Sequence, residues 1–291
     1  MSLLDDGWAF GAEFADPLAS LDTSIPDGVD GALLAAYALG LADDALVAAQ
    51  RMTWWCSRAP ELELDLAWAN VALDLLGQAR PLLVRAATAE PALVPALPAG
   101  SPIPAEDALA FFREPAGFRN HRLVEGADAD FAQAVVRLLL LSTTRLAVFE
   151  RLRHSRDQVL AGVAAKGVPE LAYHRDLAAQ WFLVLAGGTE ESRRRTVAAV
   201  AALWPLHVEA LETHAVEVAA ARAGVGADPA DVREQVAAVL GPLLETAGVV
   251  PPPSGRARPA ATGRDGAHTA EFAPLLDEMQ SVARAHPMGR W

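Results

Sequence analysis

Carboxylates on long helical segments are the residues of this sequence best suited to chemistry, because acidic side chains from neighbouring helices can hold a pair of metal ions. Asp44 stands 14 residues before a turn at Arg58–Pro60, and Asp74 stands 14 residues after it. Each helical residue advances the axis by about 1.5 Å, so both carboxylates should reach the same height of a helical hairpin. The same count around a second turn places Glu170 level with Leu140. The spacing therefore predicts one polar layer across two hairpins.

The predicted layer lacks the histidines that a di-iron or di-manganese bundle takes from two Glu-x-x-His pairs. Gly77 stands three residues after Asp74, and Tyr173 stands three after Glu170. His174 follows one step later, where we expect its ring to turn away from the Glu170 face. The third long helix has no Asp or Glu between residues 130 and 150 and presents Leu140 to the layer. We therefore interpret these positions as a vestigial metal layer and expect no bound metal and no catalytic residue in this chain.

Carboxylates left at this height would cost several kcal/mol unless they were paired or protonated. Arg51, Arg137 and Arg145 lie on the helices that carry or face the layer. The hypothesis is that these guanidinium groups form an arginine–carboxylate network in place of the metal. The alternative is that they simply face solvent.

The elements that would position the layer are all helical, since Ala and Leu dominate and two-residue alternation is scarce. The first should follow an Asp27 N-cap, and the second should turn its core face through Leu62, Leu66, Ala69, Leu73 and Leu76. The sequence predicts an all-α, ferritin-like four-helix bundle with additional C-terminal helices over residues 28–291, preceded by a flexible extension over 1–27. The predicted helices cover about 27–58, 61–90, 105–112, 130–154, 170–185, 189–222 with a bend at Pro205, 228–245 and 269–285.

Composition excludes several classes of protein. The 291 residues carry 24 Lys and Arg against 37 Asp and Glu, a formal net charge of −13, which argues against a nucleic-acid partner. The longest stretch without a charged side chain, 91–105, contains five prolines, so we expect no membrane-spanning helix. A single cysteine rules out an internal disulfide, and the acidic N-terminus does not resemble a targeting leader. These features favour a cytoplasmic protein.

Several ungapped segments resemble the C-subunit family of phenylacetyl-CoA epoxidase. The matching segments are 41–51, 55–67, 69–80, 111–114, 120–125, 263–271 and 276–280. Glycine and proline at 167 and 169 depart from the family pattern, so we expect a kink before Glu170. The segment 263–271 is interpreted as a packing or partner-contact element.

The resemblance implies a ferritin-like subunit of a bacterial monooxygenase that converts phenylacetyl-CoA to its ring 1,2-epoxide. In that family the di-iron centre lies in the homologous A subunit, a reductase subunit supplies electrons from NADPH, and the C subunit supports A without catalysing. Two alternatives stay open from the residues alone. One is a self-sufficient di-metal oxygenase, and the other is a free-standing helical scaffold or storage protein without enzymatic role.

Overall fold

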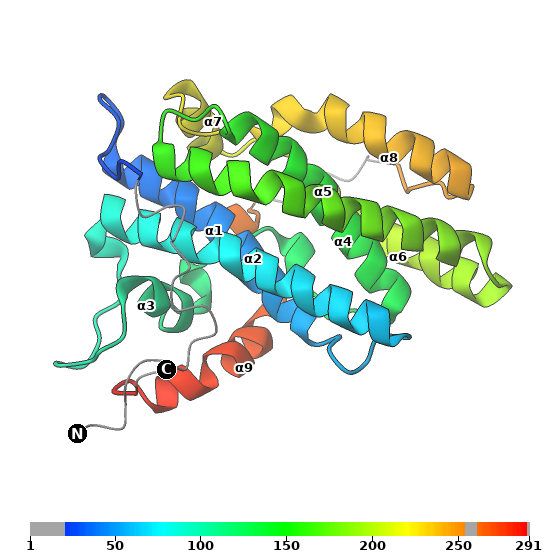
Figure 1. The fold of residues 1–291 in the computed structure, drawn as a ribbon, viewed down its shortest axis with the longest axis horizontal. Helices are drawn as coiled ribbons and strands as arrows, with labels where there is room; N and C mark the ends of the chain where they lie inside the picture. The colour runs from blue at the N-terminus through cyan, green and yellow to red at the C-terminus, as the bar shows by residue number, and fades with distance from the viewer. Residues whose placement is uncertain (1–20, 254–260, 290–291) are drawn as a thin grey trace, which may run out of the picture.

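A computed structural model describes residues 21–253 and 261–289, and within these ranges every regular element is a helix (Figure 1). Five short 3-10 turns lie between the α-helices. The α-helices are α1 (Gly31–Thr53), α2 (Leu62–Ala89), α3 (Ala105–Phe111), α4 (Phe131–Leu152), α5 (Gln158–Gly187), α6 (Glu190–Ala210), α7 (Ala215–Arg222), α8 (Arg233–Ala247) and α9 (Phe272–Ala285).

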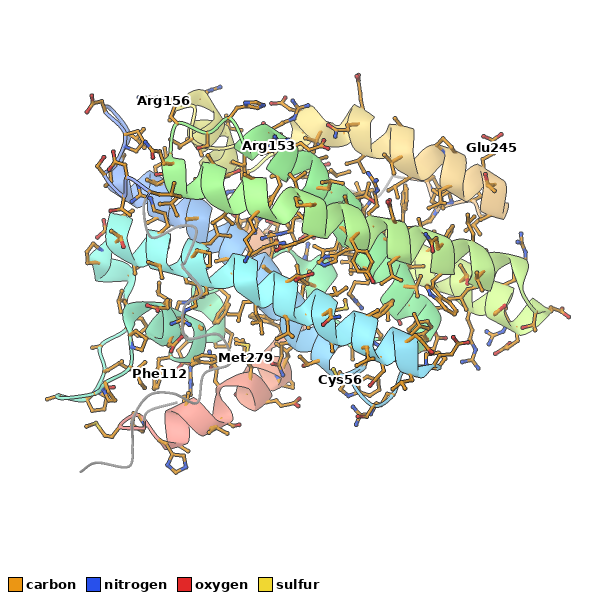
Figure 2. All side chains as sticks on the ribbon, viewed as in Figure 1. Cys56, Phe112, Arg153, Arg156, Glu245 and Met279 are labelled. Atoms are coloured by element: carbon orange, nitrogen blue, oxygen red, sulfur yellow. The ribbon has the colours of Figure 1, made fainter. Side chains whose placement is uncertain are left out.

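Two helical hairpins form the centre of the molecule, α1 with α2 and α4 with α5. Their turns, marked by Cys56 and Arg156, lie at opposite ends of the bundle (Figure 2). Arg85 near the end of α2 donates a 3.0 Å hydrogen bond to Asp157, the N-cap of α5. Helices α2 and α5 therefore lie side by side and antiparallel, and α6, α7 and α8 pack around them and around α1 and α4.

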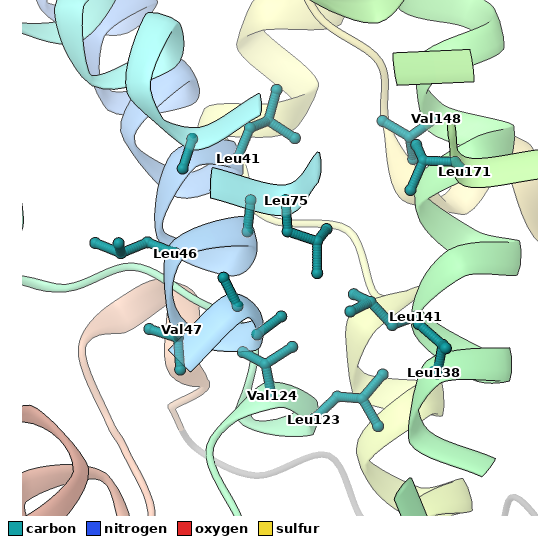
Figure 3. Packing of buried hydrophobic residues seen from close by; sticks show 14 of the residues in the cluster. Leu41, Leu46, Val47, Leu75, Leu123, Val124, Leu138, Leu141, Val148 and Leu171 are labelled. Carbon is teal, nitrogen blue, oxygen red and sulfur yellow. The ribbon is translucent and has the colours of Figure 1, made fainter. Parts of the chain in front are cut away.

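The core is aliphatic and lies between the two hairpins, where α1, α2 and α4 present leucine and valine side chains to one another (Figure 3). All of Leu138–Leu141 on α4 is buried, which confirms the prediction that this helix is central. By length and composition alone, helices α1 and α4 are long and apolar enough to cross a membrane. Their most apolar windows are 83% and 89% buried, as is typical of core helices.

The predicted core face of α2 is wrong. Leu62, Leu66, Leu73 and Leu76 are exposed, and the buried stripe instead runs through Leu64, Trp68, Val71 and Leu75. The two stripes are offset by two residues, which is roughly 200° around a helix, so they lie on opposite sides of α2. Both stripes have helical spacing, and periodicity alone could not say which one meets the core.

Helix boundaries differ from the prediction where a local turn intervenes. Asp30 caps α1 by accepting from the Ala32 N–H, because residues 26–29 form a turn in which Gly28 has a φ of +74°. Helix α5 is continuous through Pro169, whose ring lies on the exposed side where water can satisfy the freed carbonyl. Pro205 likewise lies within α6.

Only the last residues of the expected flexible extension over 1–27 can be compared with the structure. Residues 1–20 lie outside the described ranges. The carbonyls of Thr23 and Ser24 accept hydrogen bonds from Arg85, and that of Asp27 accepts one from Arg156. Residues 23–27 are therefore fastened to the bundle rather than extending from it.

Candidate functional site

The seam between α2 and α5 carries a reciprocal pair of hydrogen bonds. His174 Nε2 lies 2.9 Å from Asp74 Oδ2, and Gln78 Nε2 donates to Glu170 Oε2 over 3.0 Å. Because the helices are antiparallel, the earlier residue on one helix faces the later residue on the other, so Asp74 faces His174 and Gln78 faces Glu170. The expectation that His174 turns away from Glu170 is wrong, since four residues advance a helix by about 400° and return the side chain to nearly the same face.

Arg145 lies beneath this seam on α4 and links it to α1. Its Nε donates to Gln78 Oε1 over 2.9 Å, and one terminal nitrogen donates to the Leu41 carbonyl over 3.1 Å. Burial, only partly offset by the nearby Asp44, lowers the pKa of Arg145 to about 10. The guanidinium is therefore still a cation at neutral pH. Leu140, on the same helix, is buried in the aliphatic core.

Asp44 belongs to a separate buried cluster built around Arg264. Arg264 lies 2.7 Å from Asp44 and 3.1 Å from Glu217, and the backbone N–H of His121 donates to Asp44 over 2.8 Å. Burial alone would raise the pKa of Asp44, but Arg264 and His121 outweigh it and hold that pKa below its usual value. At Glu217 burial wins and raises the pKa. A Cβ at Gly40 would come within 3.2 Å of the Arg264 guanidinium, which explains the glycine there.

Of the three cations in the predicted arginine–carboxylate network, only Arg145 lies at the layer, and among the described residues it makes no ion pair with a carboxylate there. Its direct partners are an amide and a carbonyl. Arg51 instead donates to the carbonyls of Glu125 and Glu271. Arg137 pairs with Asp128 over 2.8 Å in the segment before α4. The contacts of both arginines lie near the start of α4 and not at the layer, so the assignment of Arg51 and Arg137 to the layer is wrong.

Gly77 and Tyr173 lie on the outside of the bundle. Gly77 is exposed, and a Cβ there would meet only the Lys166 amine at 3.8 Å. Tyr173 is 51% exposed. The inward positions that follow Asp74 and Glu170 are therefore the fourth residues, Gln78 and His174, and not the third.

The donor set of this region does not fit a pair of metal ions. The guanidinium group of Arg145 lies at the seam and that of Arg264 lies beside Asp44, and a cation next to a carboxylate opposes the binding of a metal cation there. Burial raises the pKa of Glu170, which disfavours the ionised form of its carboxyl group. Burial also lowers the pKa of His174. Among the described residues no three His, Cys, Asp or Glu side chains converge as ligands.

Three participants escaped the sequence reasoning: Gln78, Glu217 and Arg264. Gln78 lies within the matched segment 69–80, and Arg264 lies within 263–271. For these two residues the resemblance was the only signal in the sequence. His268, from the same segment, lies 2.6 Å from Glu125. These contacts support the packing interpretation of residues 263–271.

The two hairpins and their polar layer define a bundle of the ferritin-like class. The family model described as phenylacetic acid catabolic protein matches residues 23–291, and the chain belongs to that family, whose fold is the ferritin-like helical bundle. A relative from Escherichia coli strain K12, the C subunit of 1,2-phenylacetyl-CoA epoxidase, is 36% identical over 258 residues. The match covers 89% of this chain and 99% of the relative.

Proposed function

We propose that this chain is a component of a phenylacetyl-CoA epoxidase complex, in which it is a structural, non-catalytic subunit that pairs with the homologous di-iron catalytic subunit. The match to a C subunit over nearly the whole of both chains supports the membership. The observation that carries the structural role is the filling of the layer: Asp74 is bonded to His174, and Gln78 bridges Glu170 and Arg145.

A subunit of this kind contributes rigidity rather than a reacting group. The seam bonds tie α2 to α5, Arg145 ties α4 to Gln78 and to the α1 backbone, and Arg264 ties the C-terminal segment to α1. Four helices are thereby fixed by groups that need no metal. Such a frame can hold the catalytic partner's helices, and with them its iron ligands, in a productive geometry.

The remaining components follow from the same proposal. The iron pair belongs to the catalytic partner, a reductase subunit delivers electrons from NADPH, and the complex works in the cytoplasm on phenylacetyl-CoA. This chain then needs no cofactor of its own and contacts neither nucleic acid nor membrane.

The test is to purify the chain alone and together with the catalytic subunit, and to measure co-elution, metal content and epoxidation with the reductase and NADPH. The proposal expects co-elution, and epoxidation that depends on both subunits. Oxidation of substrate by this chain alone would establish the self-sufficient oxygenase instead. Failure to co-elute, with no effect on epoxidation, would favour a free-standing scaffold.

A further inference from the structure

The outer side of the α2–α5 pair is an apolar surface that the described chain leaves uncovered. We define the α2–α5 face by its apolar residues, most of which are large and more than one third exposed, and both helices turn toward the viewer in Figure 1. They are Leu62, Leu66, Ala69, Leu73, Leu76 and Val84 of α2, with Tyr173, Leu183 and Val184 of α5.

The spacing of this face indicates what covers it. On α2 the residues from Leu62 to Leu76 follow one another by four, three, four and three positions, which is the spacing of a seam that packs against another helix. On α5, Tyr173 and Val184 are eleven residues apart, or about three turns, and share one side. A helix that is apolar on two opposite sides has apolar surface to bury on both of them. Two such helices side by side therefore fit a pair of helices from a second bundle.

The size of the face is sufficient for a stable complex. On α2 the face runs from Leu62 to Val84, which is roughly 33 Å along the helix. Two helices packed 8–10 Å apart, each about 10 Å across, present a face about 20 Å wide. The product is roughly 660 Å², which lies at the lower end of the roughly 600–1,000 Å² that one partner buries in a standard protein–protein interface.

Charge at the centre of the face argues against a second copy of this chain as the occupant. Asp74 lies near the middle of α2 with its side chain 35% exposed, and the half-buried Glu170 lies beside it across the seam. A two-fold axis through this centre would bring the part-exposed Asp74 carboxylates of both copies together in an apolar surrounding, where like charges repel. The face suits a different chain, one that brings a cationic or amide donor to this point.

We propose that the α2–α5 face binds a helix pair of the homologous catalytic subunit, with a donor of that subunit opposite Asp74 and Glu170. This inference rests on the proposed function and adds the surface through which it is exerted. The apolar stripes supply the buried area, and the carboxylate pair fixes the register and rejects self-association.

The experiment measures the affinity of the full-length chain for the purified catalytic subunit, with Leu73→Glu and Tyr173→Glu as the test variants. Both positions are more than half exposed, so the fold should survive, and circular dichroism verifies it. The matched control is Val282→Glu on α9, which is 57% exposed on another helix. We expect each test variant to weaken binding roughly 30-fold or more, as loss of a central contact does, and the control to bind like the wild type.

The other outcomes separate the surface from the function. If the wild type binds and both test variants bind equally tightly, the α2–α5 face is wrong while the proposed function stands. If the wild type does not bind the catalytic subunit at all, the proposed function fails together with this inference. If the wild type forms a dimer with itself that Leu73→Glu dissociates, the occupant is a second copy and the inference is overturned.

Discussion

Removal of the buried cation at Arg264 provides a quantitative test of how buried ion pairs hold the bundle together. In Arg264→Met the side chain keeps much of its volume, but Asp44 and Glu217 lose the guanidinium that lies 2.7 Å and 3.1 Å away. Removing one member of a buried ion pair typically costs about 3–5 kcal/mol. For a chain of this size the cost corresponds to a fall in melting temperature of roughly 5–8 °C.

The pH dependence gives the prediction a sign. In the wild type the pKa of Asp44 is lowered, so its stabilisation is present above the unfolded pKa and is lost as pH falls through the folded one. In the variant the largest offset to burial, the Arg264 cation, is gone, so the pKa values of Asp44 and Glu217 both rise. A carboxylate with a raised folded pKa destabilises the protein above that pKa, and the penalty fades as pH falls and the group protonates. The deficit of the variant should therefore be largest at pH 7 and shrink toward pH 5.

The assay is urea unfolding of wild type and variant at both pH values, followed by circular dichroism. Arg194→Met is the control, because Arg194 pairs only at the surface with Glu191 and its loss should leave the unfolding midpoint unchanged. A deficit below about 1 kcal/mol at pH 7, or one equal at pH 5 and pH 7, would refute the reasoning.

Three further perturbations address the layer itself. The double variant Gly77→His with Tyr173→His should bind no stoichiometric iron by elemental analysis, because both positions lie on the outside of the bundle; a pair of irons per chain would show that the layer assignment is mistaken. Gln78→Leu should destabilise the chain by about 2–4 kcal/mol in urea, since it leaves a buried guanidinium and a half-buried carboxyl without their bridge, and a neutral result would contradict that role. Gly167→Ala should lower the free energy of unfolding by about 1–3 kcal/mol, because its Cβ would meet an aromatic carbon at 2.8 Å. The control is Gly241→Ala in α8, where nothing lies within 4 Å, and it should be neutral or stabilising by up to about 1 kcal/mol. Equal urea midpoints for the two alanine variants would argue against close packing at 167.

The helical content was predictable from the sequence. The central position of α4 was also predictable, because the run Leu138–Leu141 is apolar all the way round one turn of that helix. The core face of α2 was not predictable. That helix has two apolar stripes on opposite sides, and its packing against α1 and α5 decides which one is buried. The exposed stripe through Leu66 and Leu73 belongs to the α2–α5 face, for which we propose a partner subunit as the contact in place of the core.

The polar partners were harder to predict than the helices. Arg264 is 220 residues from Asp44, and no local pattern joins two positions so far apart. The prediction that His174 turns away from Glu170 was wrong for a geometric reason. The metal motif places its histidine three residues after the carboxylate, but the fourth residue lies closer to the carboxylate in angle around the helix. Arg137 is fully buried, yet it pairs with Asp128 rather than with the layer, which shows that burial of a cation does not identify its partner.

The role that we propose for this chain is to support a homologous catalytic subunit without reacting itself. Its most direct test is the rate of phenylacetyl-CoA epoxidation by the catalytic subunit, reductase and NADPH as this chain is titrated in. We predict no turnover with this chain as the only ferritin-like subunit, and a rate that rises and saturates at a fixed ratio to the catalytic subunit. Turnover by this chain alone, or a rate indifferent to its addition, would contradict the proposal.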